Sequence, residues 1–135
     1  MKVVLDTNIF VSGIFWPGAS SKILEAWKNE RFDLLMSISI HEEIMRVITS
    51  FRKELGLDQI SFWNKVLIFE TIFVLPKEKI SIITADPSDN KFLEAAVEGN
   101  ADYIVSQDKH LLHVKEYHGV PIVTPEGFLL VLNLH

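Results

Sequence analysis

Apolar residues along this chain form short continuous runs that alternate with helically spaced stripes. Continuous runs are typical of strands buried on both faces of a parallel sheet, and they occupy residues 2–5, 32–38, 103–105 and 120–123. Shorter extended pieces are expected at 74–76 and 80–84. Helices are expected at residues 20–29, 39–51, 57–73, 90–98 and 109–114, and from Pro125 onward. This alternation predicts a three-layer α/β fold, with a mainly parallel sheet of about five strands flanked by helices.

The helix expected at 39–51 separates two adjacent glutamates. Ser39 followed by Glu42 has the capping-box pattern, which places the start of the helix at Ser39. Apolar residues recur at helical spacing over 40–51, so Glu42 falls opposite the packed stripe and Glu43 falls at its edge. Arg46 lies one turn after Glu43, and we expect the two side chains to pair.

The helix expected at 57–73 has two apolar stripes. One contains Phe62, Val66 and Phe69, and Trp63 and Leu67 belong to the other. One stripe can face the sheet, and the other needs a cover. That cover is either the preceding helix or a second subunit, so a homodimer is one hypothesis.

Composition limits the class of protein. The 135 residues are predicted to form a single domain, and 48% hydrophobic with 23% charged residues is typical of a globular chain. Apolar runs are too short to span a membrane. With no cysteine the chain has no disulfide or thiolate metal site, and a cytoplasmic location is expected. The net charge of −5 argues against a broad basic surface for nucleic acid.

Four acidic residues are predicted to meet at one edge of the sheet. Asp6 and Asp108 directly follow strands, Asp89 opens a helix between two strands, and Glu43 lies near a helix start. Sites in open α/β sheets form outside the carboxyl ends of the strands. Two carboxylates ~4 Å apart repel by about 4 kcal/mol at an effective dielectric near 20. Such a cluster favours Mg²⁺ or Mn²⁺, and the chemistry that these ions support is phosphodiester hydrolysis.

Each acid also has a purely structural interpretation. Asp86 and Asp89 flank a Pro-Ser pair and can both belong to a helix start. Asp108 can cap the short helix after it, and Glu43 can simply pair with a neighbouring arginine. Asp6 is the exception, since a buried strand that runs into Asp-Thr-Asn is harder to explain by capping alone. A zinc site at His110, three residues before another histidine, is not expected because no third ligand is obvious; the terminal His135 is expected at the surface.

Four segments of the chain resemble the motifs of PIN-domain ribonucleases, in the order that this family shows. They are Leu5-Asp6-Thr7-Asn8-Ile9-Phe10, Glu43-Ile44-Met45-Arg46-Val47-Ile48, Asp86-Pro87-Ser88-Asp89-Asn90-Lys91-Phe92-Leu93-Glu94-Ala95-Ala96, and Tyr103-Ile104-Val105-Ser106-Gln107-Asp108-Lys109. The chain looks most similar to the toxins of VapC-type toxin–antitoxin systems. The resemblance implies a Mg²⁺- or Mn²⁺-dependent endoribonuclease of single-stranded RNA that leaves a 5′-phosphate and a 3′-hydroxyl, with an antitoxin protein as partner.

The resemblance also assigns roles to individual residues. It implies that the metal-binding and catalytic acids are Asp6, Glu43, Asp89 and Asp108. Supporting positions are Asn8 and Ser106, with Thr7 beside the first acid and Asp86 as an outer acid. Contacts with substrate phosphates are expected from Lys22, Lys91 and Lys109. Where many relatives carry a further acid, this chain has His110, so a fifth carboxylate is not expected.

Two other functions remain open at this point. The fold can serve as a binding or dimerisation module with negligible turnover, which the acidic composition favours slightly. An aspartate-nucleophile phosphohydrolase is the second rival. Such enzymes usually place a second carboxylate two residues after the nucleophile, and this chain has Asn8 there.

Overall fold

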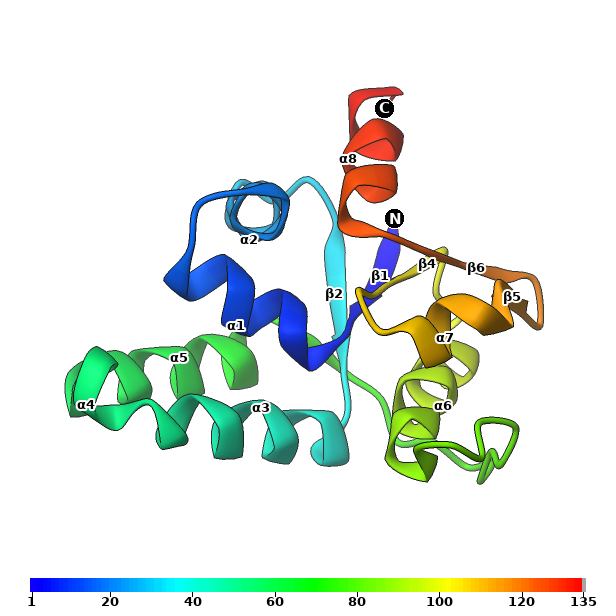
Figure 1. Cartoon of the computed structure of the whole chain (residues 1–135), viewed down its shortest axis with the longest axis horizontal. Coiled ribbons are helices and arrows are strands. Elements are labelled where there is room, and N and C mark those ends of the chain that lie inside the picture. The colour runs from blue at the N-terminus through cyan, green and yellow to red at the C-terminus, as the bar shows by residue number, and fades with distance from the viewer. Residues whose placement is uncertain (135) are drawn as a thin grey trace.

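A computed structural model describes residues 1–134, and it contains a six-stranded sheet flanked by helices (Figure 1). The strands are β1 (Lys2–Leu5), β2 (Asp33–Met36), β3 (Ile72–Phe73), β4 (Tyr103–Val105), β5 (Glu116–Tyr117) and β6 (Val120–Val123). Their order across the sheet is β3-β2-β1-β4-β6-β5, and all neighbours pair in parallel except β5 with β6. The predicted mainly parallel α/β fold is therefore confirmed. The expectation for His135 falls outside the described residues.

Helices lie on both sides of this sheet. They are α1 (Thr7–Phe15), α2 (Ala19–Lys28), α3 (Ile38–Ser50), α4 (Arg52–Leu55), α5 (Leu57–Phe69), α6 (Asn90–Gly99), α7 (Lys109–Val114) and α8 (Pro125–Leu134), with a short 3-10 turn η1 (Pro87–Asp89) before α6. In Figure 1, α1 to α5 lie to one side of β2, and α6 lies to the other side, packed against β1, β2 and β4. Among residues 1–134, no helix has the length and apolar character needed to cross a membrane.

The core forms around β1 and β2 in the middle of the sheet. Val3, Val4, Leu34 and Leu35 are at most 1% exposed. Side chains on successive strand residues point to opposite faces, so a continuous apolar run fits only a strand that is covered on both faces. The central strands thus fix the edge at which Asp6 emerges.

Helix α1 was not predicted by the hydrophobic pattern. Its residues continue the apolar character of β1 almost without a break, and the change from strand to helix occurs at Asp6. The helix packs against α2 at Gly13, where a Cβ atom would lie 2.9 Å from the carbonyl oxygen of Ser20 and 2.5 Å from a methyl carbon of Leu24. Glycine therefore allows the two helices to approach closely.

Several predicted boundaries were wrong. Helix α3 begins at Ile38, and Ser37 caps it by accepting a hydrogen bond from the Ile40 amide at 3.3 Å, so Ser39 is not the cap. The helix predicted over 57–73 ends at Phe69, and its last expected residues form β3, which pairs with β2. No strand forms at 74–76 or 80–84. The two-residue strand β5 was not predicted.

Candidate functional site

Asp6 lies at the end of β1 and at the start of α1. Its backbone amide donates to the carbonyl of Val105 at 3.0 Å, which ties it to the end of β4. Its side chain is 3% exposed, and Oδ1 accepts a hydrogen bond from the Asn8 amide at 2.7 Å, as the N-cap of α1. Capping uses one carboxylate oxygen and leaves Oδ2 facing the end of β4.

Ser106 links Asp6 to Asp108. This fully buried residue follows β4, and its hydroxyl donates to Oδ2 of Asp6. The same hydroxyl accepts from the Asp108 amide at 2.9 Å. Asp108 in turn caps α7, because its Oδ1 accepts from the His110 amide at 2.7 Å. The two acids that follow strands are therefore joined through one serine, as the sheet-edge argument predicted.

Asp89 enters the same region from the start of α6. It is 7% exposed, and its Oδ2 is buried with no hydrogen-bond partner among the described residues. Asp86 is exposed and caps η1, with its Oδ1 accepting from the Ser88 amide at 3.2 Å and from the Ser88 hydroxyl at 2.7 Å. The capping expected of this Asp-Pro-Ser-Asp segment thus belongs to Asp86, and the Asp89 side chain makes no capping hydrogen bond to α6.

Glu43 is held by two side chains from other elements. The hydroxyl of Thr7 donates to one carboxylate oxygen, and the ammonium group of Lys91 contacts the other at 2.5 Å. The side chains of Lys91 and Glu43 are only 14% and 16% exposed. The predicted pair with Arg46 also forms, at 4.0 Å, but the Arg46 side chain is 75% exposed. Lys91 is therefore the main partner, and no local pattern indicated it.

The charges of the acids interact and shift the pKa values of Asp6 and Asp89. Burial raises the pKa of Asp6, hydrogen bonds from Ser106 and Asn8 lower it, and the charges of Asp108 and Glu43 raise it further. Burial also raises the pKa of Asp89, to about 7, together with the Asp108 carboxyl beside it and the charges of Asp86 and Asp6. The structure thus brings all four predicted acids together.

This donor set suits a hard divalent cation. Carboxylate oxygens are the ligands that Mg²⁺ and Mn²⁺ prefer. Oδ2 of Asp89 accepts no hydrogen bond from the described residues, so it can coordinate a cation. Within residues 1–134, no three acidic or histidine side chains form a ready-made metal-binding group. Oxygens of Asp6 and Glu43 are engaged by Ser106, Thr7 and Lys91 instead. The residues that would hold a cation are Asp6, Glu43, Asp89 and Asp108.

The remaining predicted residues lie around the acids or farther out. Asn8 is exposed in the first turn of α1, and its backbone amide supports Asp6. Lys22 on α2 and Lys109 at the start of α7 are exposed. Lys91 is the one predicted phosphate contact that touches an acid of the cluster.

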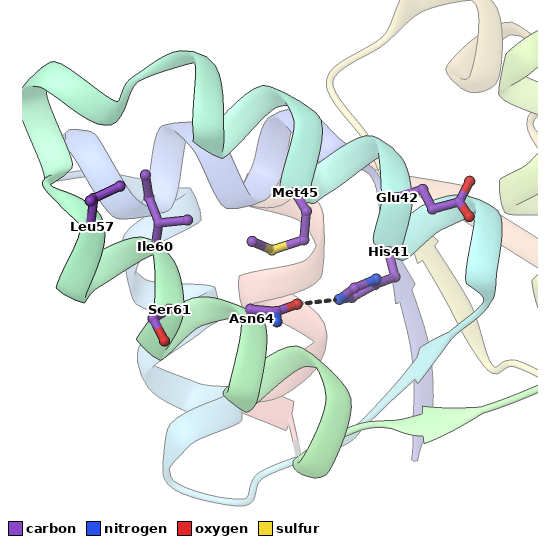
Figure 2. A pocket seen from close by; sticks show the side chains of 7 residues that line it. All are labelled: His41, Glu42, Met45, Leu57, Ile60, Ser61 and Asn64. Carbon is purple, nitrogen blue, oxygen red and sulfur yellow. Dashed lines mark hydrogen bonds between the residues drawn. The ribbon is translucent and has the colours of Figure 1, made fainter.

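A separate cleft lies between α3 and α5, away from the four acids. Figure 2 shows its lining, which includes Met45, Leu57 and Ile60, with the His41 ring hydrogen-bonded to Asn64 at 2.9 Å. Its volume is about 530 Å³. The two adjacent glutamates of α3 were predicted to lie on different sides of the helix. Glu42 is exposed and borders this cleft, whereas Glu43 faces the acids.

Comparison with known proteins gives a consistent result. The sequence profile of the PIN domain matches residues 2–110. The uncharacterised protein MJ1680 of Methanocaldococcus jannaschii is 33% identical over 144 residues, an alignment that covers 100% of this chain and 83% of that protein.

Solved structures share the fold at low sequence identity. VapBC2 from Rickettsia felis, crystallised with a DNA fragment from its promoter, superposes with a TM-score of 0.60 at 16% identity, covering 92% of this chain and 98% of that one. PAE2754 from Pyrobaculum aerophilum gives 0.59 at 14% identity, with 100% and 91% coverage. FitAcB from Neisseria gonorrhoeae gives 0.53 at 14% identity, with 92% and 98% coverage.

Proposed function

The chain belongs to the PIN-domain family, and from this premise we propose that it is a metal-dependent endoribonuclease of single-stranded RNA. Proteins of this family are in general nucleases. The observation that carries the proposal is the cluster of four acids, in which buried Asp89 has an unpartnered oxygen and a raised pKa. A buried cluster of like charges is expected at a site built for a cation.

Each acid has a proposed role that follows from its surroundings. Asp6 and Asp108 would hold Mg²⁺ or Mn²⁺, and Asp89 and Glu43 would complete the site directly or through water. The bound ion supplies a Lewis acid that activates water and stabilises charge on the phosphate.

Other side chains position these acids or meet the substrate. Ser106 orients Asp6, and Thr7 orients Glu43. Asn8 supports the site from the first turn of α1, and Asp86 acts as an outer acid. The substrate phosphates would be met by Lys22, Lys91 and Lys109. The products would carry a 5′-phosphate and a 3′-hydroxyl.

The biological setting is proposed from the structural neighbours. Two of them, VapBC2 and FitAcB, are named for two-component assemblies, and this supports a toxin that pairs with an antitoxin protein.

We take residues 1–135 as one nuclease domain that acts on cellular RNA in the cytoplasm. We also propose a homodimer through the apolar surface of α5 and β3. The alternative is a PIN-fold binding module without turnover.

Cleavage assays with the full chain, free of any antitoxin, test the proposal. Asp6→Asn and Asp108→Asn should each lower the rate of Mg²⁺-dependent cleavage of an RNA pool at least about 100-fold, since asparagine removes a ligand charge. Asparagine is as good an N-cap as aspartate, so both variants should fold. Asp58→Asn, at an exposed acid in α5, is the matched control and should cleave normally.

The outcomes separate the candidate functions. Cleavage that survives chelation with EDTA, or survives both aspartate substitutions, contradicts the metal-carboxylate mechanism. Absence of cleavage on every RNA offered, with Mg²⁺ or with Mn²⁺, favours the binding module. A covalent phosphoenzyme on Asp6 would instead point to the phosphohydrolase.

A further inference from the structure

A second cleft lies directly beside the acid cluster. Its volume is about 430 Å³, and it is formed by residues 79–88, the start of α6 and the start of α3. Most of its polar lining carries ammonium or hydroxyl groups, from Lys79, Lys91, Ser39, Ser81, Thr84 and Ser88. These groups donate hydrogen bonds to phosphate and ribose oxygens.

The wall of this cleft is fixed although it contains no strand. Asn90 is 3% exposed, and its side chain ties down the loop by donating to the carbonyls of Ile83 and Pro87 at 2.9 and 3.0 Å and accepting from the Ile83 amide at 3.0 Å. The acid in the lining, Glu94, accepts from the Ile80 amide at 2.8 Å. Glu94 keeps its negative charge, so the lining carries two ammonium groups and one carboxylate.

The cleft adjoins the acid cluster at two residues. Lys91 lines the cleft and contacts Glu43 at 2.5 Å, and Ser88 precedes Asp89 in the chain. A strand whose scissile phosphate lay at the acids would have its neighbouring nucleotides within this cleft. Lys91 is paired with Glu43, so the exposed Lys79 supplies the positive charge of this lining that a polyanion can meet.

We propose that this cleft is the subsite for the sugar–phosphate backbone of the RNA strand next to the scissile phosphate, with Lys79 contacting one phosphate. The inference rests on the proposed function and adds a substrate-binding residue that lies outside the acid cluster. Contacts with phosphate and sugar carry no sequence information, so binding through this subsite should not depend on RNA sequence.

Binding of a fluorescein-labelled single-stranded RNA, followed by anisotropy in EDTA so that no cleavage intervenes, tests this subsite. Lys79→Gln removes one phosphate contact. For single strands one contact contributes about 0.7 to the slope of log affinity against log salt, which corresponds to about fourfold weaker binding at ~0.15 M salt. Lys77→Gln is the matched control, because Lys77 lies two residues away in the same loop and does not line the cleft. It should bind like the parent.

Five results are decisive. Weaker binding and a shallower salt slope for Lys79→Gln alone support the subsite. Equal binding by the two lysine variants overturns it, as does a parent chain that binds no RNA. If the metal-loaded parent cleaves RNA while Lys79→Gln binds normally, the subsite is wrong and the nuclease stands. If Lys79→Gln binds weakly but the parent never cleaves, the nuclease proposal fails and the subsite stands.

Discussion

Asp6 has two tasks in this structure, and they do not compete. One carboxylate oxygen caps α1 through the Asn8 amide, and the other meets the hydroxyl of Ser106. Asp108 repeats the arrangement by capping α7 while its own amide binds Ser106. A carboxylate placed one to three residues after a parallel strand can therefore cap the following helix and still face the sheet edge. This is why capping patterns did not argue against a site here.

The pKa of Asp89 predicts how stability depends on pH. The folded-state pKa of about 7 lies above the ordinary value of 3.8, so the folded chain binds this proton more tightly than the unfolded chain. The free energy of unfolding of the metal-free parent should fall as pH rises from about 4 to about 7. Asp89→Asn lacks this titration. At pH 8 it should be more stable than the parent by on the order of 2–4 kcal/mol.

Thermal or urea unfolding in EDTA at several pH values measures this difference. Near pH 4 the stability gap between the parent and Asp89→Asn should largely close, because the folded parent keeps the proton there and the pH has reached the ordinary pKa of 3.8 of the unfolded chain. A gap that stays constant between pH 4 and pH 8 contradicts the raised pKa.

The ion pair between Lys91 and Glu43 predicts a second difference, in stability at neutral pH. Lys91→Gln leaves a largely buried carboxylate without its nearest cation, so the free energy of unfolding should fall by about 1–3 kcal/mol. Arg46→Gln removes the exposed 4.0 Å partner of the same Glu43 and should cost less than about 0.5 kcal/mol. Urea denaturation compares them, and equal losses would mean that Lys91 is no better a partner than Arg46.

At the scale of elements, the sequence predicted most helices and the central strands but misplaced boundaries where local signals disagreed with tertiary contacts. Both Ser37 and Ser39 are plausible caps by type, yet Ser37 is the buried one, directly after β2. Helix α1 was hidden because Ile9 and Phe10 continue the apolar run of β1. Such choices depend on which residues the sheet buries, and local spacing does not contain that information.

Cap substitutions test the boundary of α3. Ser37→Ala should lower the free energy of unfolding by about 1 kcal/mol, because the Ile40 amide loses its acceptor. Ser39→Ala changes an exposed residue inside the first turn and should have almost no effect. Both are measured by urea denaturation of the full chain. A larger loss for Ser39→Ala would restore the boundary that the capping-box pattern suggests.

At the scale of the whole molecule, the alternation of apolar runs predicted the layers and the parallel sheet, because a continuous apolar run indicates a strand that is buried on both faces. The two-residue strands β3 and β5 lack such a signal, since each is defined by pairing with a neighbour. The candidate site likewise has a part that the sequence predicted and a part that it did not. Acids that follow β1 and β4 were predictable from the sheet-edge rule, whereas the contact of Glu43 with Lys91 joins residues 48 positions apart and had no local signature.

The surface at the end of α5 predicts the state of assembly. Phe69 is 77% exposed, and Ile72 and Phe73 on the edge strand β3 are 42% and 39% exposed. Single exposed apolar side chains are ordinary, but several together usually mark an interaction surface. Since β3 is also an unpaired sheet edge, this face is well suited to a second copy of the chain. Light scattering should therefore give a mass near twice 15.4 kDa.

A charge on that face should separate the two copies. Phe69→Glu places an unpaired carboxylate in the proposed interface and should shift the mass towards 15.4 kDa while circular dichroism stays unchanged. Leu130→Glu is the matched control, because Leu130 is also an exposed apolar residue, at 66%, but lies on α8. It should leave the dimer intact. A parent that remains at 15.4 kDa at high concentration removes the homodimer, and a dimer that survives Phe69→Glu would mean that the contact does not lie on α5.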